Sequence, residues 1–197
     1  IQSKGIKALV RIYDNDEIII KRVLDAGADG IIVPMIKSKE EAQRMIDSVY
    51  YPPKGKRGVG LSRAQNFGIR FNEYQEYLEK EIIIIAQIEH IDAINNLEEI
   101  LAFDEIDATL VGPYDLSASM GKPGKFNEPD VQEAVKKYDD ICKAHNKPMG
   151  AHVISSNSDD LQEKIDLGYS FLAFSLDFFF LGDGARNEMK KLKRWKK

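Results

Sequence analysis

A recurring junction constrains this chain more than any other feature: an amphipathic segment ends at a glycine, and a short apolar run follows. Residues 24–27 end at Gly27 and lead into the apolar run 30–34, and residues 165–168 end at Gly168 and lead into 171–174. A helix that stops at glycine, followed by a tight turn and a buried strand, is the joint of a repeated βα unit. The junction therefore predicts a chain built from strand–helix repeats.

The apolar runs are continuous rather than alternating, as in the strands of parallel sheets that are buried on both faces. Six strands are predicted, at residues 7–11, 30–34, 82–89, 108–112, 149–154 and 171–176. Seven helices are predicted, at residues 17–26, 39–48, 73–80, 91–103, 130–144, 159–166 and 179–193. This alternation favours an α/β fold with a parallel sheet, in a single domain over residues 1–197.

Polar residues stand where helix N-caps belong, namely Asp16, Ser38 and either Asn157 or Ser158. The segment 17–24 is ambiguous, because its three consecutive isoleucines would also suit a strand. The preceding cap cluster Asp14-Asn15-Asp16 and the terminal Gly27 favour a helix. A doubly wound sheet and a closed barrel both fit the alternation. No G-x-G-x-x-G motif follows a predicted strand, so a nucleotide-binding Rossmann fold has no support beyond the fold class.

The composition limits which kinds of partner and which cellular compartment we expect for this protein. Lys plus Arg number 28 and Asp plus Glu 32, so the net charge of −4 makes no electrostatic case for nucleic acid. The longest apolar run, residues 82–86, is far too short to span a bilayer. Cys142 is the single cysteine, which rules out a disulfide within the chain. We therefore expect a cytoplasmic protein without membrane or nucleic-acid partners.

Polar residues gather at the predicted carboxyl ends of strands, where β/α barrels carry their active sites. Arg11 ends the first strand, Gln87 and Glu89 end the third, and Asp115 follows the fourth. Gln87 and Glu89 are two residues apart, so both side chains point to the same side. Two carboxylates from neighbouring strands suit Mg²⁺ or Mn²⁺, and an arginine beside them could stabilise an oxyanion. The alternatives are a solvated or capping glutamate and a turn aspartate.

The sequence also contains one long connection and three histidines. Residues 50–71 include Arg57 and Arg63 among glycines, and a connection this long is typical of a functional or a disordered loop. His90 is expected to open the next helix, and His145 to lie solvated at a helix end. His152 lies inside a predicted buried strand, where a core histidine with a hydrogen-bonding partner is the favoured interpretation.

The motifs together resemble those of the HpcH/HpaI aldolase family, over essentially the whole chain. The stretches that carry the resemblance are Val33-Pro34-Met35, Tyr51-Pro52-Pro53, Arg57-Gly58-Val59-Gly60, Gln87-Ile88-Glu89 and residues 112–121. The resemblance implies a TIM-type β/α barrel and a class II, metal-dependent aldolase. Such an enzyme cleaves a 4-hydroxy-2-oxo acid or a 2-keto-3-deoxy sugar acid reversibly to pyruvate and an aldehyde, with Mg²⁺ or Mn²⁺ as cofactor and Co²⁺ as a further option.

The resemblance also assigns roles to single residues. Glu89 and Asp115 would be the metal ligands, Arg11 the catalytic arginine that stabilises negative charge, and Gln87 a residue that lines the pyruvate site. In the stretch formed by Gly112, Pro113, Tyr114 and Asp115, backbone amides would hold the pyruvate carboxylate. We also expect a homo-oligomer, because the family packs its last helix against a neighbouring subunit and this chain has an aromatic cluster at residues 178–181.

One departure from the family pattern concerns the general base. The family carries a base histidine on its second strand, and the ten residues before Arg11 contain no histidine. Six predicted strands in place of eight lead to the same expectation, that the barrel lacks its first two βα units. We therefore expect pyruvate recognition with slow turnover. The alternatives are a coenzyme A thioester lyase of the same superfamily and a non-catalytic barrel subunit or binding protein.

Overall fold

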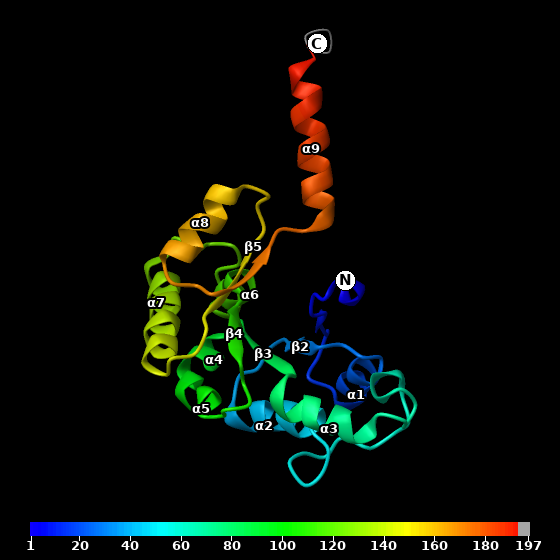
Figure 1. The fold of residues 1–197 in the computed structure, drawn as a ribbon. Helices are drawn as coiled ribbons and strands as arrows, with labels where there is room; N and C mark the ends of the chain where they lie inside the picture. Colours follow the sequence, from blue (N-terminus) through cyan, green and yellow to red (C-terminus); the bar gives the residue numbers. More distant parts are fainter. Residues whose placement is uncertain (193–197) are drawn as a thin grey trace.

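The computed structural model describes residues 1–192, which form a curled sheet with helices on its outer side (Figure 1). Six parallel strands pair in chain order. They are β1 (Leu9–Arg11), β2 (Gly30–Val33), β3 (Ile83–Ile88), β4 (Ala108–Val111), β5 (Gly150–Val153) and β6 (Phe171–Phe174). The architecture is a partial β/α barrel, which confirms the predicted fold class and all six strands.

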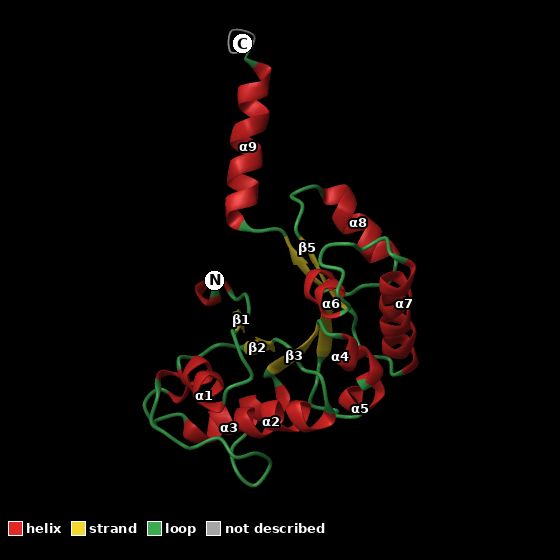
Figure 2. Ribbon diagram, turned by 180° about the vertical axis from the view of Figure 1, so that it is seen from behind, coloured by secondary structure: helices red, strands yellow, loops and turns green. Residues whose placement is uncertain are grey.

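The α-helices alternate with these strands (Figure 2). They are α1 (Glu17–Asp25), α2 (Lys39–Val49), α3 (Phe71–Lys80), α4 (Ile91–Asn95), α5 (Leu97–Leu101), α6 (Pro113–Ser119), α7 (Pro129–Ala144), α8 (Ser158–Asp166) and α9 (Asp177–Lys191). Short 3-10 turns lie at η1 (Gln2–Lys4) and η2 (Arg63–Gln65). Within residues 1–192, none of the helices is both long and apolar enough to cross a membrane.

The predicted N-caps are confirmed. The side chains of Asp16, Ser38 and Asn157 each accept a hydrogen bond from a first-turn amide of α1, α2 and α8. In α1, Ile20 is completely buried whereas Ile18 is exposed, which is the one-sided burial of a surface helix. The ambiguous isoleucine run is therefore helical, as the cap at Asp16 predicted.

Several predicted elements differ from the structure in their bounds, among them α3, which begins at Phe71 rather than at residue 73. The helix expected at residues 91–103 is divided into α4 and α5 at Asn96, whose side-chain amide donates to the Lys37 carbonyl. Residues 113–119 form α6, which begins with a proline at its first helical position and was not predicted. The last helix begins two residues earlier than expected, and its predicted end at Lys193 lies outside the described residues.

Apolar residues cover both faces of the sheet. The outer face packs against the helices, and the inner face leads to the predicted site. The larger core lies between the sheet and the helices, and Ile84, Ala86 and Ile88 of β3 belong to it. The alternate residue Ile85 belongs to a second, smaller cluster on the inner face. Because side chains alternate along a strand, Gln87 and Glu89 continue this inner face beyond the small cluster.

Candidate active site at the strand ends

Three side chains predicted for the site form one hydrogen-bonded row at the carboxyl ends of β1 and β3. The Arg11 Nε–H donates to Gln87 Oε1 over 3.3 Å, and the Gln87 Nε2–H donates to Glu89 Oε2 over 2.6 Å. The side-chain amide of Gln87 thus accepts a hydrogen bond from the Arg11 guanidinium and donates one to the Glu89 carboxylate. This arrangement fixes the orientation of both charged groups.

Glu89 is the buried charge of this row, with only 2% of the residue exposed. Its second oxygen, Oε1, accepts the backbone N–H of Met35 over 3.1 Å. Met35 follows β2 with φ 56°, a left-handed conformation that is uncommon for residues other than glycine and asparagine. That conformation, which the sequence motif did not reveal, supplies the hydrogen bond.

Burial raises the pKa of the Glu89 carboxyl above its ordinary value, and the neighbouring Asp115 carboxylate adds to the rise. The Met35 N–H and the Arg11 charge act in the opposite direction. A buried carboxyl group with a raised pKa beside a second carboxylate is a pattern typical of a site that binds a cation. Within residues 1–192, no group of three or more His, Cys, Asp and Glu side chains could hold a metal ion. The pair would therefore need substrate or water oxygens as further ligands.

Glu89 packs closely against Gly112. A Cβ atom at Gly112 would lie 2.8 Å from Glu89 Oε2, so any larger residue would displace the carboxylate. Pro113 then starts α6, which places Asp115 in the exposed first turn of this helix. Tyr114 is also exposed, and its ring packs edge-on against Phe126 with 4.6 Å between ring centroids.

Comparison with known proteins identifies the family. The sequence profile of the HpcH/HpaI aldolase/citrate lyase family matches residues 1–181. The chain belongs to this family. A curated relative, the 5-keto-4-deoxy-D-glucarate aldolase of Escherichia coli, is 35% identical over 169 residues, which cover 86% of this chain and 65% of that protein. The family member thus spans just under two thirds of the length of this relative.

Solved structures of the same family share its fold. The HpcH/HpaI aldolase from Desulfitobacterium hafniense DCB-2 superposes with a TM-score of 0.86 at 30% identity, covering 100% of this chain and 77% of that one. A HpcH/HpaI aldolase/citrate lyase family protein from Burkholderia cenocepacia J2315 also has a TM-score of 0.86, at 28% identity, over 93% of this chain and 72% of that one.

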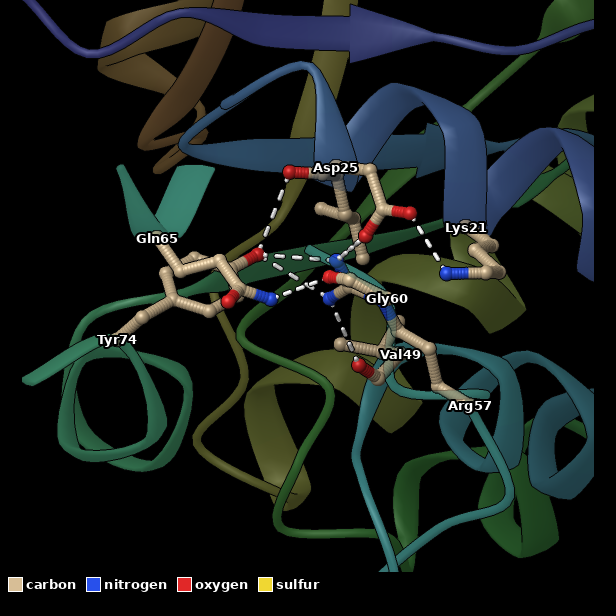
Figure 3. Close-up of polar contacts among 8 residues, drawn as sticks. Lys21, Asp25, Val49, Arg57, Gly60, Gln65 and Tyr74 are labelled. Carbon is tan, nitrogen blue, oxygen red and sulfur yellow. Dashed lines mark hydrogen bonds and ion pairs between the residues drawn. The ribbon is translucent and has the colours of Figure 1, made fainter. Parts of the chain in front are cut away.

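The long connection before α3 contains a separate polar network around Arg57, which is buried (Figure 3). Its Nη2 contacts the Asp25 carboxylate over 2.6 Å, and both terminal nitrogens donate to the Tyr74 hydroxyl. Asp25 in turn pairs with Lys21 over 2.6 Å. In this family member the RGVG motif therefore joins the loop to α1 and α3, and Arg57 does not belong to the strand-end row.

A cavity of about 620 Å³ lies outside the barrel, against α1, α2 and the residues after α2. Its walls include the cations Lys21 and Lys56 and the anion Asp47, and Lys56 pairs with Asp47 over 2.6 Å. None of the residues predicted for the site lines it. The cavity is thus distinct from the strand-end site.

The histidines lie largely as predicted. His90 caps α4, and its Nδ1 accepts the Asp92 amide over 3.1 Å. His145 ends α7 and is exposed. His152 is half-buried in β5, where its Nε2 lies 3.4 Å from the carbonyl oxygen of Ser175. It has the hydrogen-bonding partner that was expected of a core histidine.

Proposed function

We propose that this chain carries the site of a class II aldolase, which cleaves a 4-hydroxy-2-oxo acid or a 2-keto-3-deoxy sugar acid to pyruvate and an aldehyde. The observation that carries the proposal is the buried Glu89 carboxylate at the strand ends, with Asp115 beside it and Arg11 linked to it through Gln87. Membership of the family and the 35% identity to a sugar-acid aldolase support the substrate class.

Glu89 and Asp115 would hold the divalent cation, since hard cations such as Mg²⁺ and Mn²⁺ prefer oxygen ligands. When bound, the cation supplies Lewis acidity that stabilises the enolate of pyruvate. Arg11 is placed to stabilise negative charge that develops on the reacting oxygen. Gln87 holds Arg11 and Glu89 in their mutual orientation.

The remaining substrate contacts follow from the family resemblance and stay predictions. Gly112 lets the Glu89 carboxylate lie directly against the backbone at the start of α6, because a Cβ there would meet the carboxylate. Pro113 has no N–H, so the first backbone donors of α6 are those of Tyr114 and Asp115. These two amides are the ones that we propose to bind the pyruvate carboxylate.

Titration with Mn²⁺ tests the cation site. We expect Glu89→Gln and Asp115→Asn each to weaken binding at least tenfold, because each removes one of two anionic ligands. Glu81→Gln is the matched control, since Glu81 precedes β3 and lies at the opposite end of the strand from Glu89. Unchanged affinity in both site variants would refute the assignment.

Activity is tested on the same protein once folding is established. Oxalate, a planar mimic of the pyruvate enolate, should bind in the presence of Mg²⁺ or Mn²⁺. Cleavage of a 4-hydroxy-2-oxo acid is then followed by coupling the released pyruvate to lactate dehydrogenase. A folded, Mn²⁺-loaded chain that does not bind oxalate would contradict a pyruvate site.

Two related functions can be tested with the same preparation. The family name includes citrate lyases, so a coenzyme A thioester should be offered as an alternative substrate. A chain that binds oxalate but cleaves neither substrate would instead favour a binding protein.

We also propose that the chain assembles with copies of itself through α9. This helix projects away from the barrel (Figure 1), and its first turns expose Phe178, Phe180 and Leu181. Exposed aromatic and aliphatic side chains on a projecting helix are typical of a protein interface. Light scattering should find an oligomer, and Leu181→Asp should weaken it. A monomer at micromolar concentration would refute this.

A further inference from the structure

His152 lies on the inner face of the sheet, beside the candidate site. Val111 pairs with Ala151 in the β4–β5 ladder, so the next residues along, Gly112 and His152, are neighbours. Gly150, two residues before His152, faces Phe171 of the inner cluster, as the 2.8 Å approach of a Cβ built there shows. Because side chains alternate, His152 points to the same side.

The backbone after β6 orients this imidazole. Ser175 is buried and adopts φ 55°, and its N–H donates to the Val153 carbonyl over 2.7 Å. Its hydroxyl donates to the Ile154 carbonyl over 3.0 Å. These two bonds tie Ser175 to β5 and its end, with its carbonyl oxygen 3.4 Å from His152 Nε2. Left-handed conformations of non-glycine residues cluster at functional sites, where the surrounding contacts hold them.

A carbonyl oxygen can only accept a hydrogen bond, so this contact requires the hydrogen on Nε2. In the neutral ring, Nδ1 is then an acceptor with a free lone pair. The two nitrogens flank the same ring carbon, and the N–H of Nε2 and the lone pair of Nδ1 point in widely divergent directions. Since Nε2 is directed to the backbone after β6, the lone pair of Nδ1 points away from β6.

We propose that His152 is a proton-transfer residue for the second half of the substrate. The proposal rests on the proposed aldolase function. Neighbouring strands lie about 4.8 Å apart, so the backbones of Glu89 and His152 are about 10 Å apart across Gly112, which has no side chain. A small substrate held at Glu89 and Asp115 can place its C4 hydroxyl in this interval.

The proton transfer balances without a further reactant. In cleavage, Nδ1 of His152 takes the C4 hydroxyl proton, the C3–C4 bond breaks, and the bonding electrons form the enolate of pyruvate while C4 becomes the aldehyde carbon. The protonated ring then returns the proton to C3 of the enolate, which yields pyruvate and restores the neutral imidazole. Ser175 is a positioning residue in this scheme, because it acts only through the ring.

Two substrates separate this role from a structural one. His152→Gln should lower cleavage of a 4-hydroxy-2-oxo acid by about 10²- to 10⁴-fold, the usual contribution of a general base. Oxaloacetate decarboxylation yields the same enolate without removal of a hydroxyl proton, so it should change only a few-fold. His145→Gln, at the exposed end of α7, is the matched control and should change neither rate.

The ring tautomer is measured without metal or substrate. Nitrogen-15 shifts of the His152 ring should show hydrogen on Nε2 and a bare Nδ1, and Ser175→Gly, which tolerates the same backbone conformation, should preserve this pattern. Ser175→Val should alter it. Hydrogen on Nδ1 instead, or full cleavage by His152→Gln, would overturn the proposal. A wild-type chain inert toward both substrates would refute the aldolase function and the proton transfer, whereas the tautomer would still decide the role of Ser175.

Discussion

The backbone amide of Met35 should control cation affinity, and Met35→Ile tests this. Met35 adopts φ 56°, and its N–H donates to Glu89 Oε1 over 3.1 Å. A β-branched residue is strongly disfavoured in this conformation, so isoleucine should turn the peptide and remove the bond. A hydrogen bond to a charged group contributes about 1.5–3 kcal/mol, which corresponds to roughly 10- to 100-fold in affinity.

Two further variants separate the amide from the side chain and from stability. Met35→Gly keeps the N–H and tolerates a positive φ, so its affinity for Mn²⁺ should stay within about threefold of wild type. Asn146 also has a positive φ, 52°, but follows α7 at the opposite end of the sheet from Glu89. Asn146→Ile should therefore destabilise the fold by a similar amount and leave the affinity unchanged.

The assay is calorimetric titration with Mn²⁺ on protein shown to be folded by circular dichroism. If Met35→Ile binds Mn²⁺ as tightly as wild type, the amide does not hold the ligand in its binding geometry. If Met35→Gly loses as much affinity as Met35→Ile, the effect belongs to the methionine side chain. Either result would refute the reasoning from backbone conformation.

Three more predictions concern stability and are measured by unfolding. Arg57→Met should cost about 3–5 kcal/mol, because it breaks a buried ion pair with Asp25, and at about 2–4 °C per kcal/mol it should lower Tm by roughly 6–20 °C; an unchanged Tm would contradict this. Burial raises the pKa of Glu89, so folded metal-free protein loses stability when this carboxyl ionises. The unfolding free energy of wild type relative to Glu89→Gln should therefore be highest below the ordinary pKa of 4.5 and should fall as pH rises through the raised pKa. A difference that does not change with pH would contradict this prediction. Tyr138→Phe removes a hydroxyl that lies 2.7 Å from Thr109 Oγ1 and accepts the Gly150 amide, and urea unfolding should show a loss of about 1–3 kcal/mol rather than none.

Residue patterns were sufficient for the strands and for most of the helices, because burial on both faces and N-caps are local signals. The spacing of Gln87 and Glu89 likewise predicted that they share a face, and their 2.6 Å contact agrees. The start of α6 at Pro113 was not predicted, since a Gly-Pro-Tyr-Asp run also suits a turn. The break at Asn96 depends on a carbonyl 59 residues away, which no local pattern contains.

The positive φ of Met35 could not be predicted from the residue pattern either. Nothing in the residue type indicates it, because methionine has no preference for the left-handed region, and only the packing of β2 against β3 places its N–H at Glu89. The motif that contains Met35 supported the family resemblance. It did not indicate which atom of the motif contacts the site.

The junction between β4 and β5 has a consequence for local unfolding. The two strands share a single registered pair, Val111 with Ala151, and the Tyr138 hydroxyl bridges them through Thr109 and Gly150. Neither α8 nor α9 contains a buried residue. The segment from β5 onward should therefore open as one cooperative unit at lower free energy than β2 to β4, and its amides should exchange with deuterium first. Opening would separate His152 from Glu89, so the population of the closed unit would limit how often both halves of the site are assembled together.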